Sequence, residues 1–211
     1  MKKTKPTSPR VQRNRDAAAQ SILEAARAIM REEGVAALSM QGLARRMDMR
    51  APSLYNYFAS KMDIYDALFR LGMALYNARL QEATKESTDA HDEIRIVIET
   101  NLSFALENPE LYQLCFERPV PGFVPSQASL DLSFGMLENS YSRVVQLKKR
   151  LNTKLSAQQL VDMIIATAHG ITALHLANEP HLPLGQGRFG SLIPIFVNIF
   201  ETAIPAKGET K

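Results

Sequence analysis

The sequence predicts an all-α fold of about nine helices. Apolar residues recur at helical spacing along most of the 211 residues, and no segment sustains the alternation of apolar and polar residues typical of a strand. The hairpin turn pairs Asn-Gly and Asp-Gly do not occur. Loops are expected at residues 118–126 and 179–187, which are rich in proline and glycine. Helices are expected over residues 15–33, 39–47, 52–58, 61–84, 89–107, 109–116, 127–150, 156–178 and 188–204.

Residues 39–61 predict a helix-turn-helix followed by the start of a longer helix. In the first short helix, the apolar stripe contains Leu43, Ala44 and Met47, and the polar side contains Gln41, Arg45 and Arg46. Pro52 suits the first turn of a new helix, and its ring biases Ala51 away from helical angles. The second helix is therefore expected from Pro52 to about Phe58, with Leu43, Ala44, Leu54 and Phe58 in the core.

Capping residues predict where these helices begin and end. Gly34 closes the helix 15–33, and Ser39 is the expected N-cap of the next. Asp48 lies in the turn, where its tolerance of left-handed angles keeps the turn feasible. Ser60, with Asp63 three residues later, predicts a capping box at the start of the helix 61–84.

Positive charge gathers in the same part of the chain. Residues 1–61 contain twelve Lys or Arg against five Asp or Glu, so this part carries +7 and the other 150 residues carry −4. Neutralising phosphates is the main sequence-independent source of DNA affinity, so this asymmetry favours nucleic-acid binding. Residues 1–14 are expected to be a disordered arm that either contacts DNA or stays solvated. Its basic residues, with Arg15 just after it, are Lys2, Lys3, Lys5, Arg10, Arg13 and Arg15.

Composition disfavours a membrane or secreted protein. The apolar stretches are interrupted by charge, Pro or Gly before the roughly 18 residues that a membrane span needs. No apolar signal segment follows the lysine-rich start, so a cytoplasmic location and no membrane partner are expected. Cys115 is the single cysteine, which fits a reducing compartment. It is expected to be a core residue rather than a redox sensor.

The sequence also disfavours an enzyme. It contains no Gly-rich phosphate loop, nucleophile elbow or paired metal motif. His169, His175 and His181 are six residues apart and do not share one helix face, so a buried or interface histidine is the better interpretation. No catalytic residue, cofactor or metal is expected.

Two segments, ILEAARAIMREEGVAALSMQGLARRM and LYNYFASKMDIYDAL, together resemble the N-terminal domain of the tetracycline-repressor (TetR) family of transcriptional regulators. The resemblance covers about residues 15–68. It implies a DNA-binding domain at 15–60 and a helical effector-binding and dimerisation domain at 61–206. Residues 207–211 are too polar to pack and are expected to be a disordered tail. The family usually has glycine where this chain has Asp48, and small or polar residues where it has Arg50. The positions that match family DNA contacts, together with Arg50 and Ala51 between them, are Ser39, Met40, Gln41, Arg50, Ala51, Pro52, Ser53, Tyr55, Asn56, Tyr57 and Lys61.

The chemistry of these positions suits DNA. Asn56 can pair with adenine through two hydrogen bonds and Ser53 can donate or accept, so these two are expected to set sequence choice. Tyr55 and Tyr57 can reach phosphates through their hydroxyl groups, and Lys61 is expected to set register. Arg50 can contact a base or a phosphate, or remain a solvated surface arginine.

The C-terminal part resembles a TetR subclass marked by a His-Gly pair (WHG-type), here His169 and Gly170, although this chain has no tryptophan. The resemblance implies that helices 156–178 and 188–204 pair across a twofold axis as a four-helix bundle; an intramolecular core is the alternative. Interface residues are then Leu160, Ile164, Ile171, Leu192, Ile195, Phe196, Ile199 and Phe200. A pocket for a small apolar or amphipathic effector would be lined by Phe104, Leu111, Tyr112, Phe116, Phe134, Met136, Leu137, His169 and Leu174, each of which could instead be core.

The function expected from this resemblance is a homodimeric regulator of the TetR type. It would bind a palindromic double-stranded operator and, as a repressor, leave it when an effector binds. The alternatives are a DNA-binding regulator without a small-molecule ligand and a helical protein-interaction module.

Overall fold

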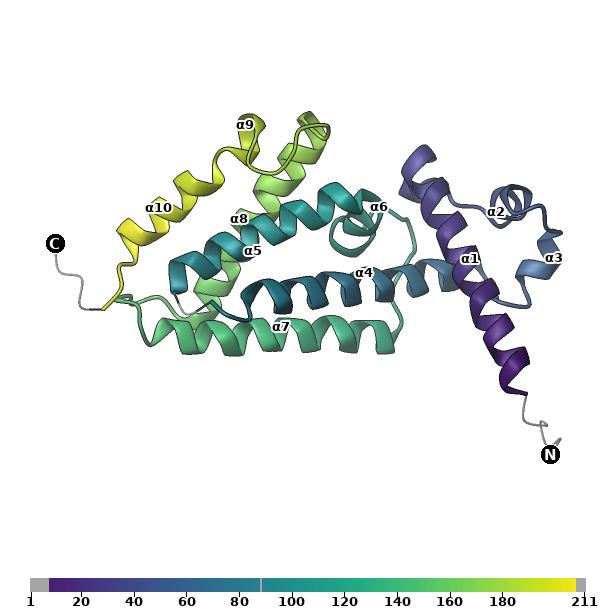
Figure 1. Cartoon of the computed structure of the whole chain (residues 1–211), viewed down its shortest axis with the longest axis horizontal. Helices are drawn as coiled ribbons and strands as arrows, with labels where there is room; N and C mark the ends of the chain where they lie inside the picture. Colours follow the sequence, from purple (N-terminus) through teal and green to yellow (C-terminus); the bar gives the residue numbers. More distant parts are fainter. Residues whose placement is uncertain (1–7, 88, 208–211) are drawn as a thin grey trace.

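The computed structural model describes residues 8–87 and 89–207, in which the fold is all-helical as predicted (Figure 1). Across these residues the only β-type pairing is an isolated bridge between Leu151 and Ala206. The elements are α1 (Pro9–Glu33), η1 (Val35–Ala37), α2 (Met40–Arg46), α3 (Ala51–Leu54), α4 (Lys61–Thr84), α5 (Ala90–Glu107), α6 (Pro109–Tyr112), η2 (Gln113–Glu117), α7 (Gln127–Lys148), α8 (Ala157–Asn178), α9 (Gly187–Gly190) and α10 (Ile193–Ala203).

The first helix begins earlier than predicted. The Ser8 side chain accepts a hydrogen bond from the Val11 amide at 3.4 Å, and Pro9 occupies the first turn. This N-cap and proline start α1 at Pro9, so the predicted disordered arm is wrong for residues 9–14. Lys2, Lys3 and Lys5 lie outside the described residues.

The last predicted helix, 188–204, is two helices. Pro194 has no amide N–H to continue a helix from α9, and it sits instead in the first turn of α10. Ser191 and Leu192 form the turn between the two helices. Beyond α10, the Lys207 amide donates to the Arg150 carbonyl at 2.7 Å, so the predicted free tail does not begin at Lys207. Residues 208–211 lie outside the described part.

Helix α4 connects the two parts of the molecule, running from α1 and α3 into the larger helical domain (Figure 1). Its first half supplies Ile64, Tyr65 and Leu68 to a core that also contains buried residues of α1 and α2. The Tyr65 hydroxyl donates to the Val35 carbonyl at 2.7 Å and fixes this half of α4 to η1. The same core continues to Leu111 beside α4. The N-terminal three-helix unit therefore shares its core with the rest of the chain.

A second core lies between α5, α8 and α10 and contains Ile98, Leu160, Ile171 and Phe200. By length and composition alone, α8 could cross a membrane, contrary to the sequence-based expectation. Part of its apolar surface packs in this core. A central helix that packs on more than one side needs such a composition in a folded helical domain.

Helix α7 is fastened to α4 at its N-terminal end. Asp66 on α4 accepts hydrogen bonds from the Ser126 amide at 2.7 Å and from the Ser129 hydroxyl at 2.7 Å. Burial pulls the pKa of Asp66 upward, but these hydrogen bonds and nearby Arg70 outweigh it and hold the pKa below its usual range. Ser129 is the one fully buried residue of α7, so the helix is held more by its ends than by its middle.

Gly72 marks a close approach of η2 to α4, and its replacement by alanine provides a test. A Cβ atom at Gly72 would lie 2.7 Å from the Cys115 Sγ, so Gly72→Ala should lower the free energy of unfolding by about 1–3 kcal/mol. In urea denaturation, the double variant Gly72→Ala/Cys115→Ala should lose less than the sum of the two single variants. Additive losses would contradict this contact.

Candidate DNA-binding interface and effector cavity

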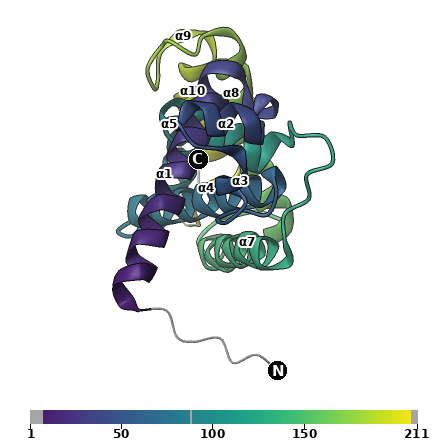
Figure 2. The same ribbon diagram turned by 90° about the vertical axis from the view of Figure 1, so that its right-hand side faces the viewer.

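Helices α1, α2 and α3 form one end of the molecule, which faces the viewer in Figure 2. Asp48 adopts the left-handed angle expected of it, with φ of 51°. Leu43 and Leu54 are fully buried beneath the turn, as predicted for the core. The Ser39 N-cap and the Ser60/Asp63 capping box also form as predicted. The helix-turn-helix therefore has the local structure that its sequence specifies.

The predicted DNA contacts mostly lie on this end of the molecule. Ser39, Gln41, Arg50, Pro52, Tyr55 and Asn56 are exposed, whereas Ala51, Ser53, Tyr57 and Lys61 are half-buried. Met40 differs, because its side chain is buried in the core. Only its backbone, in the first turn of α2, remains suited to a phosphate contact.

The recognition helix is shorter than the predicted 52–58. Helix α3 ends at Leu54, and the chain continues as a turn in which the Tyr57 and Phe58 amides donate to the Leu54 carbonyl at 2.9 Å and 3.0 Å. Arg15 on α1 donates to the Asn56 carbonyl at 3.2 Å. This cation satisfies a carbonyl at the end of the recognition segment, in the manner of a helix C-cap. Arg15 thus supports the segment from α1.

The arginines of α2 are not equivalent. Arg46 forms two hydrogen bonds of 2.7 Å with the Glu32 carboxylate on α1. These hydrogen bonds lower the pKa of Glu32 and raise that of Arg46. Because Arg46 is paired with an acid, Arg45 and Arg50, both exposed, are better placed to attract phosphates.

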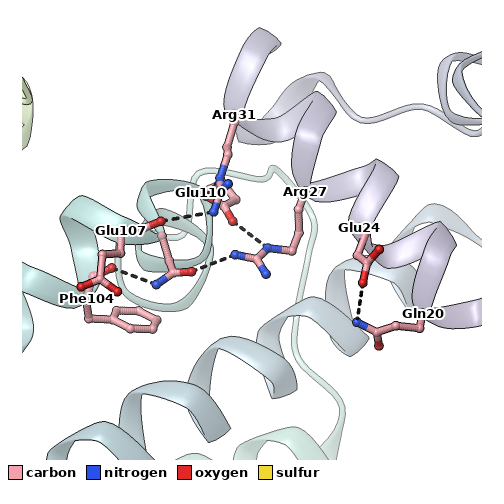
Figure 3. A network of polar contacts seen from close by, with 8 residues as sticks. Gln20, Glu24, Arg27, Arg31, Phe104, Glu107 and Glu110 are labelled. Atoms are coloured by element: carbon pink, nitrogen blue, oxygen red, sulfur yellow. Dashed lines mark hydrogen bonds and ion pairs between the residues drawn. The ribbon is translucent and has the colours of Figure 1, made fainter.

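A buried carboxylate joins the DNA-binding end to the larger domain (Figure 3). Glu110 on α6 has a fully buried side chain, and its two oxygens accept from the Nε atoms of Arg27 at 2.8 Å and Arg31 at 2.6 Å. Arg27 also donates to the Asn108 side chain at 2.8 Å, and Arg31 to the Glu107 carbonyl at 3.2 Å. The C-terminal half of α1 is therefore fixed to α6 by bonds with defined directions. The network was not predicted from sequence, although the spacing of Arg27 and Arg31 places both on one face of α1.

Helix α6 leads directly into η2, a π-helical turn, and η2 reaches the wall of a cavity. The Phe116 ring lies 5.4 Å from the Tyr76 ring and 4.9 Å from the His169 ring, measured between centroids. Cys115 packs against α4, and burial raises the pKa of its thiol to about 12. A protonated, packed thiol fits the core role predicted for Cys115.

The cavity has a volume of about 310 Å³ and lies between α4, α5, η2, α7 and α8. This volume is at the lower end of the range for small-molecule sites. Five of the predicted pocket residues line it: Phe116, Phe134, Met136, Leu137 and His169. None of the residues that α4 and α5 contribute to the wall was predicted from sequence, including Tyr76, Thr84, Glu93 and Val97.

The other four predicted pocket residues lie elsewhere. Tyr112 is behind the wall, where its hydroxyl hydrogen-bonds the His169 Nδ1 at 3.0 Å. Phe104 and Leu111 are buried in the first core. Leu174 is 48% exposed. These side chains suit a pocket by type, but helix packing decides which of them face it.

The predicted dimer interface divides in a similar way. Leu160, Ile164, Ile171 and Phe200 are buried within the protomer against α5, so they do not form an exposed face. Leu192 and Phe196 are half-buried, whereas Ile195 and Ile199 are each 54% exposed. On α8 the opposite stripe is exposed and contains Met163, Ala166, Gly170, Ala173, Leu174 and Ala177, with the polar Gln159 and Asp162 toward its N-terminal end. A helix that is apolar all round does not reveal from sequence which stripe its own chain covers.

Within the described residues, no group of three or more His, Cys, Asp or Glu side chains is arranged to hold a metal ion. His175 is fully buried, and its Nε2 donates to the Leu182 carbonyl at 3.0 Å. His91, also buried, contacts the Ile204 carbonyl through Nε2 at 2.9 Å. Both histidines anchor neighbouring backbone.

Comparison with known proteins agrees with this architecture. Residues 22–68 match the sequence profile of the bacterial regulatory proteins of the tetR family. This match covers the C-terminal half of α1, the helix-turn-helix and the first turns of α4. The chain therefore carries a TetR-type DNA-binding domain.

Curated relatives of this chain are distant and match only in part. The nucleoid occlusion factor SlmA of Haemophilus influenzae is 26% identical over 124 residues, which cover 56% of this chain and 55% of SlmA. The transcriptional activator FasR of Mycolicibacterium smegmatis is 27% identical over 103 residues, covering 49% of this chain and 47% of FasR. The chain thus spans about half the length of the curated relatives it matches.

Solved structures share the whole fold. A Rhodococcus sp. RHA1 protein of unknown function superposes with a TM-score of 0.73 and 20% identity over 88% of this chain and 94% of its own. FadR of Bacillus subtilis in complex with stearoyl-CoA has a TM-score of 0.64 and 17% identity over 85% and 96%. A Saccharomonospora viridis transcriptional regulator in complex with choline has a TM-score of 0.67 and 16% identity over 89% and 96%. At these identities the likeness establishes the fold alone.

Replacing Glu110 tests the junction between α1 and α6. Glu110→Gln leaves two arginines without their carboxylate and should lower the free energy of unfolding by about 3 kcal/mol, the low end for a broken buried pair. Hydrogen exchange should quicken in the C-terminal half of α1 and in α6. The matched control is Glu32→Gln, which breaks the exposed pair with Arg46 and should leave this exchange unchanged. Equal effects of the two variants would contradict a special role for Glu110.

Proposed function

We propose that this TetR-family regulator is a cytoplasmic homodimer that represses transcription from a palindromic operator and releases it when a small molecule fills the cavity. The supporting observation is the continuous connection from cavity to DNA-binding end. Phe116 on η2 lines the cavity, and Glu110 on the adjoining α6 holds Arg27 and Arg31 of α1. A ligand that moves η2 therefore acts on the helix that supports the helix-turn-helix.

DNA recognition is proposed to use the exposed segment between α2 and α4. Asn56 and Ser53 read bases, while Tyr55, Tyr57 and Lys61 contact phosphates. Gln41 and the N-terminal backbone of α2 add phosphate contacts where the helix dipole favours anions. Exposed Arg50 contributes positive charge at the turn.

Dimerisation is proposed through the exposed stripes of α8 and α10. The α8 stripe is rich in alanine and contains Gly170, so a second copy of this helix can approach closely. Ile195 and Ile199 of α10 provide large apolar side chains beside it. This face replaces the interface predicted from sequence, half of whose residues are buried in the protomer. A twofold axis here presents two recognition segments to half-sites about one DNA turn apart, roughly 34 Å.

Release of the operator requires that the effector bind more tightly to the protomer conformation that does not fit the operator. An effector with equal affinity for both conformations would not shift the equilibrium between them. A tenfold loss of operator affinity needs only about 1.4 kcal/mol of coupling. The related fold of B. subtilis FadR is described with stearoyl-CoA, and that of the S. viridis regulator with choline. These complexes support a ligand-responsive function for this chain as well.

Selection of bound fragments from random and genomic DNA by the purified protein tests this function. Enrichment of a twofold palindrome with salt-dependent affinity is the expected result. Adding a ligand of the cavity should then lower the affinity for the selected site. No enrichment over random DNA would instead favour a protein-interaction role for the helix-turn-helix.

Two substitutions separate base reading from phosphate binding. Asn56→Ala should cost about 1–3 kcal/mol on the selected operator and change its sequence preference, with little effect on random DNA. Lys61→Ala should weaken binding to both DNAs and reduce the salt slope by about 1. Lys85→Ala, at the other end of α4, is the charge-matched control. Equal losses on operator and random DNA for both variants would contradict these roles.

Acidic substitutions on the exposed stripe of α10 test the proposed dimer interface. The double variant Ile195→Glu/Ile199→Glu should be monomeric by light scattering at micromolar concentration and should lose operator affinity, because two carboxylates would be desolvated at the interface. The control Leu75→Glu/Val124→Glu changes exposed apolar residues elsewhere and should remain dimeric. An unmodified protein that is monomeric under these conditions would end the proposal.

A further inference from the structure

The wall of the cavity contains one buried polar atom that lacks a partner. Glu93 on α5 lines the cavity, and its side chain is only 6% exposed. Its Oε1 accepts a hydrogen bond from the Arg143 Nε of α7. Its Oε2 is buried and has no hydrogen-bond partner among the described residues. Buried carboxylate oxygens are normally satisfied, so this atom needs a donor.

The missing group is a hydrogen-bond donor, and an anion does not fit there. Arg143 already neutralises the Glu93 carboxylate and also donates to the Thr84 carbonyl. An anionic group placed at Oε2 would add a second negative charge next to Glu93, in surroundings where water does not screen it. A hydroxyl or amine group would complete the hydrogen bonding, and could displace a water molecule there at little cost.

Arg143 is the one cation among the described wall residues, and its charge is already paired with Glu93, so the wall offers no second place for an anion. The other ionisable wall residues, Tyr76, Cys115 and His169, are neutral at pH 7. Burial raises the pKa of Tyr76 and of Cys115 to about 12 each, and it lowers the pKa of His169. Most of the remaining wall is aliphatic or aromatic, as at Phe116 and Phe134. The wall thus combines a large apolar surface with one buried carboxylate oxygen that lacks a partner among the described residues.

We infer that the effector is a mainly apolar small molecule with a hydroxyl or amine group that donates to the Glu93 Oε2, and without a carboxylate or phosphate inside the cavity. This inference rests on the proposed effector function and names its ligand class. Because related folds are described with ligands as different as stearoyl-CoA and choline, the fold does not choose the ligand. The ligand class is set instead by the chemistry of the wall at Glu93.

Three probes with the same ten-carbon chain test the inference: decan-1-ol, decylamine and decanoate. Binding to the full-length protein is measured by calorimetry and by the rise in melting temperature, since a ligand of the folded state stabilises it. Decan-1-ol and decylamine should each bind at least about tenfold more tightly than decanoate, which is the size of one hydrogen bond to a charged group. Equal or tighter binding of decanoate overturns the inference, as does the absence of binding by all three.

The variant Glu93→Gln tests whether Glu93 is the acceptor for the ligand's hydrogen bond. It can keep a bond to Arg143 while placing an amide N–H where Oε2 was, so affinity for the alcohol and amine should fall about tenfold and affinity for decanoate should rise. Glu99→Gln, on the same helix but away from the cavity, is the matched control and should change neither. An unchanged probe ranking in Glu93→Gln overturns the inference. If that variant does not fold, the ranking on the unmodified protein still decides.

Operator affinity measured on the same preparations separates this inference from the proposed function. If the alcohol binds through Glu93 but does not weaken DNA binding, the ligand class stands and effector release is wrong. If the operator binds well and only decanoate releases it, the regulator function stands and the ligand class is wrong.

Discussion

The arrangement of the two parts of this molecule depends on one buried carboxylate. Glu110 lies between two arginines of α1, and each of its oxygens accepts a separate bond. A buried acid with two partners is costly to desolvate and adds little net stability compared with an apolar contact. It does, however, fix how α1 and α6 are oriented, because the N–H groups of each guanidinium can donate to a carboxylate oxygen only in a narrow range of positions. The geometry of α1 relative to α6 is thus set by hydrogen bonds, while the surrounding apolar core sets only their proximity.

That constraint explains the local structure of α6 and η2. Helix α6 has a single turn before the chain becomes π-helical, and π-turns in proteins often occur at functional sites. The π-turn brings Cys115 against Gly72 while Phe116 reaches the cavity wall. If Phe116 moved, η2 could not compensate by sliding along α4, because Cys115 already packs tightly against α4. In the proposed release of the operator, the adjoining residues of α6 carry such a change to Glu110.

The sequence predicted local structure better than it predicted which side chains pack together. The boundaries of α4 and α8, the left-handed Asp48 and the Ser60/Asp63 capping box follow from short-range rules that operate within a few residues. The interface residues and half of the pocket could not be predicted in this way. Helix α8 is apolar on all sides, so its sequence does not distinguish Ile164, which faces α5, from Met163, which is exposed. Likewise, the Glu93–Arg143 and Glu110–Arg27 pairs join residues 50 and 83 positions apart, and no periodicity reports such a pairing.

Helix α7 is the wall of the cavity best suited to respond to a ligand. Its attachments are polar and lie toward its ends: Asp66 holds the Ser126 and Ser129 end, and Glu93 holds Arg143. Between them, Phe134 and Leu137 line the cavity yet remain 59% and 43% exposed, so this stretch gains little from burial when the cavity is empty. A ligand that covers these side chains and donates to Glu93 acts on both the apolar and the polar attachment of α7. Because α7 and η2 border the same cavity, we propose that a ligand stabilising one arrangement of α7 also selects the position of Phe116, and through it that of Glu110.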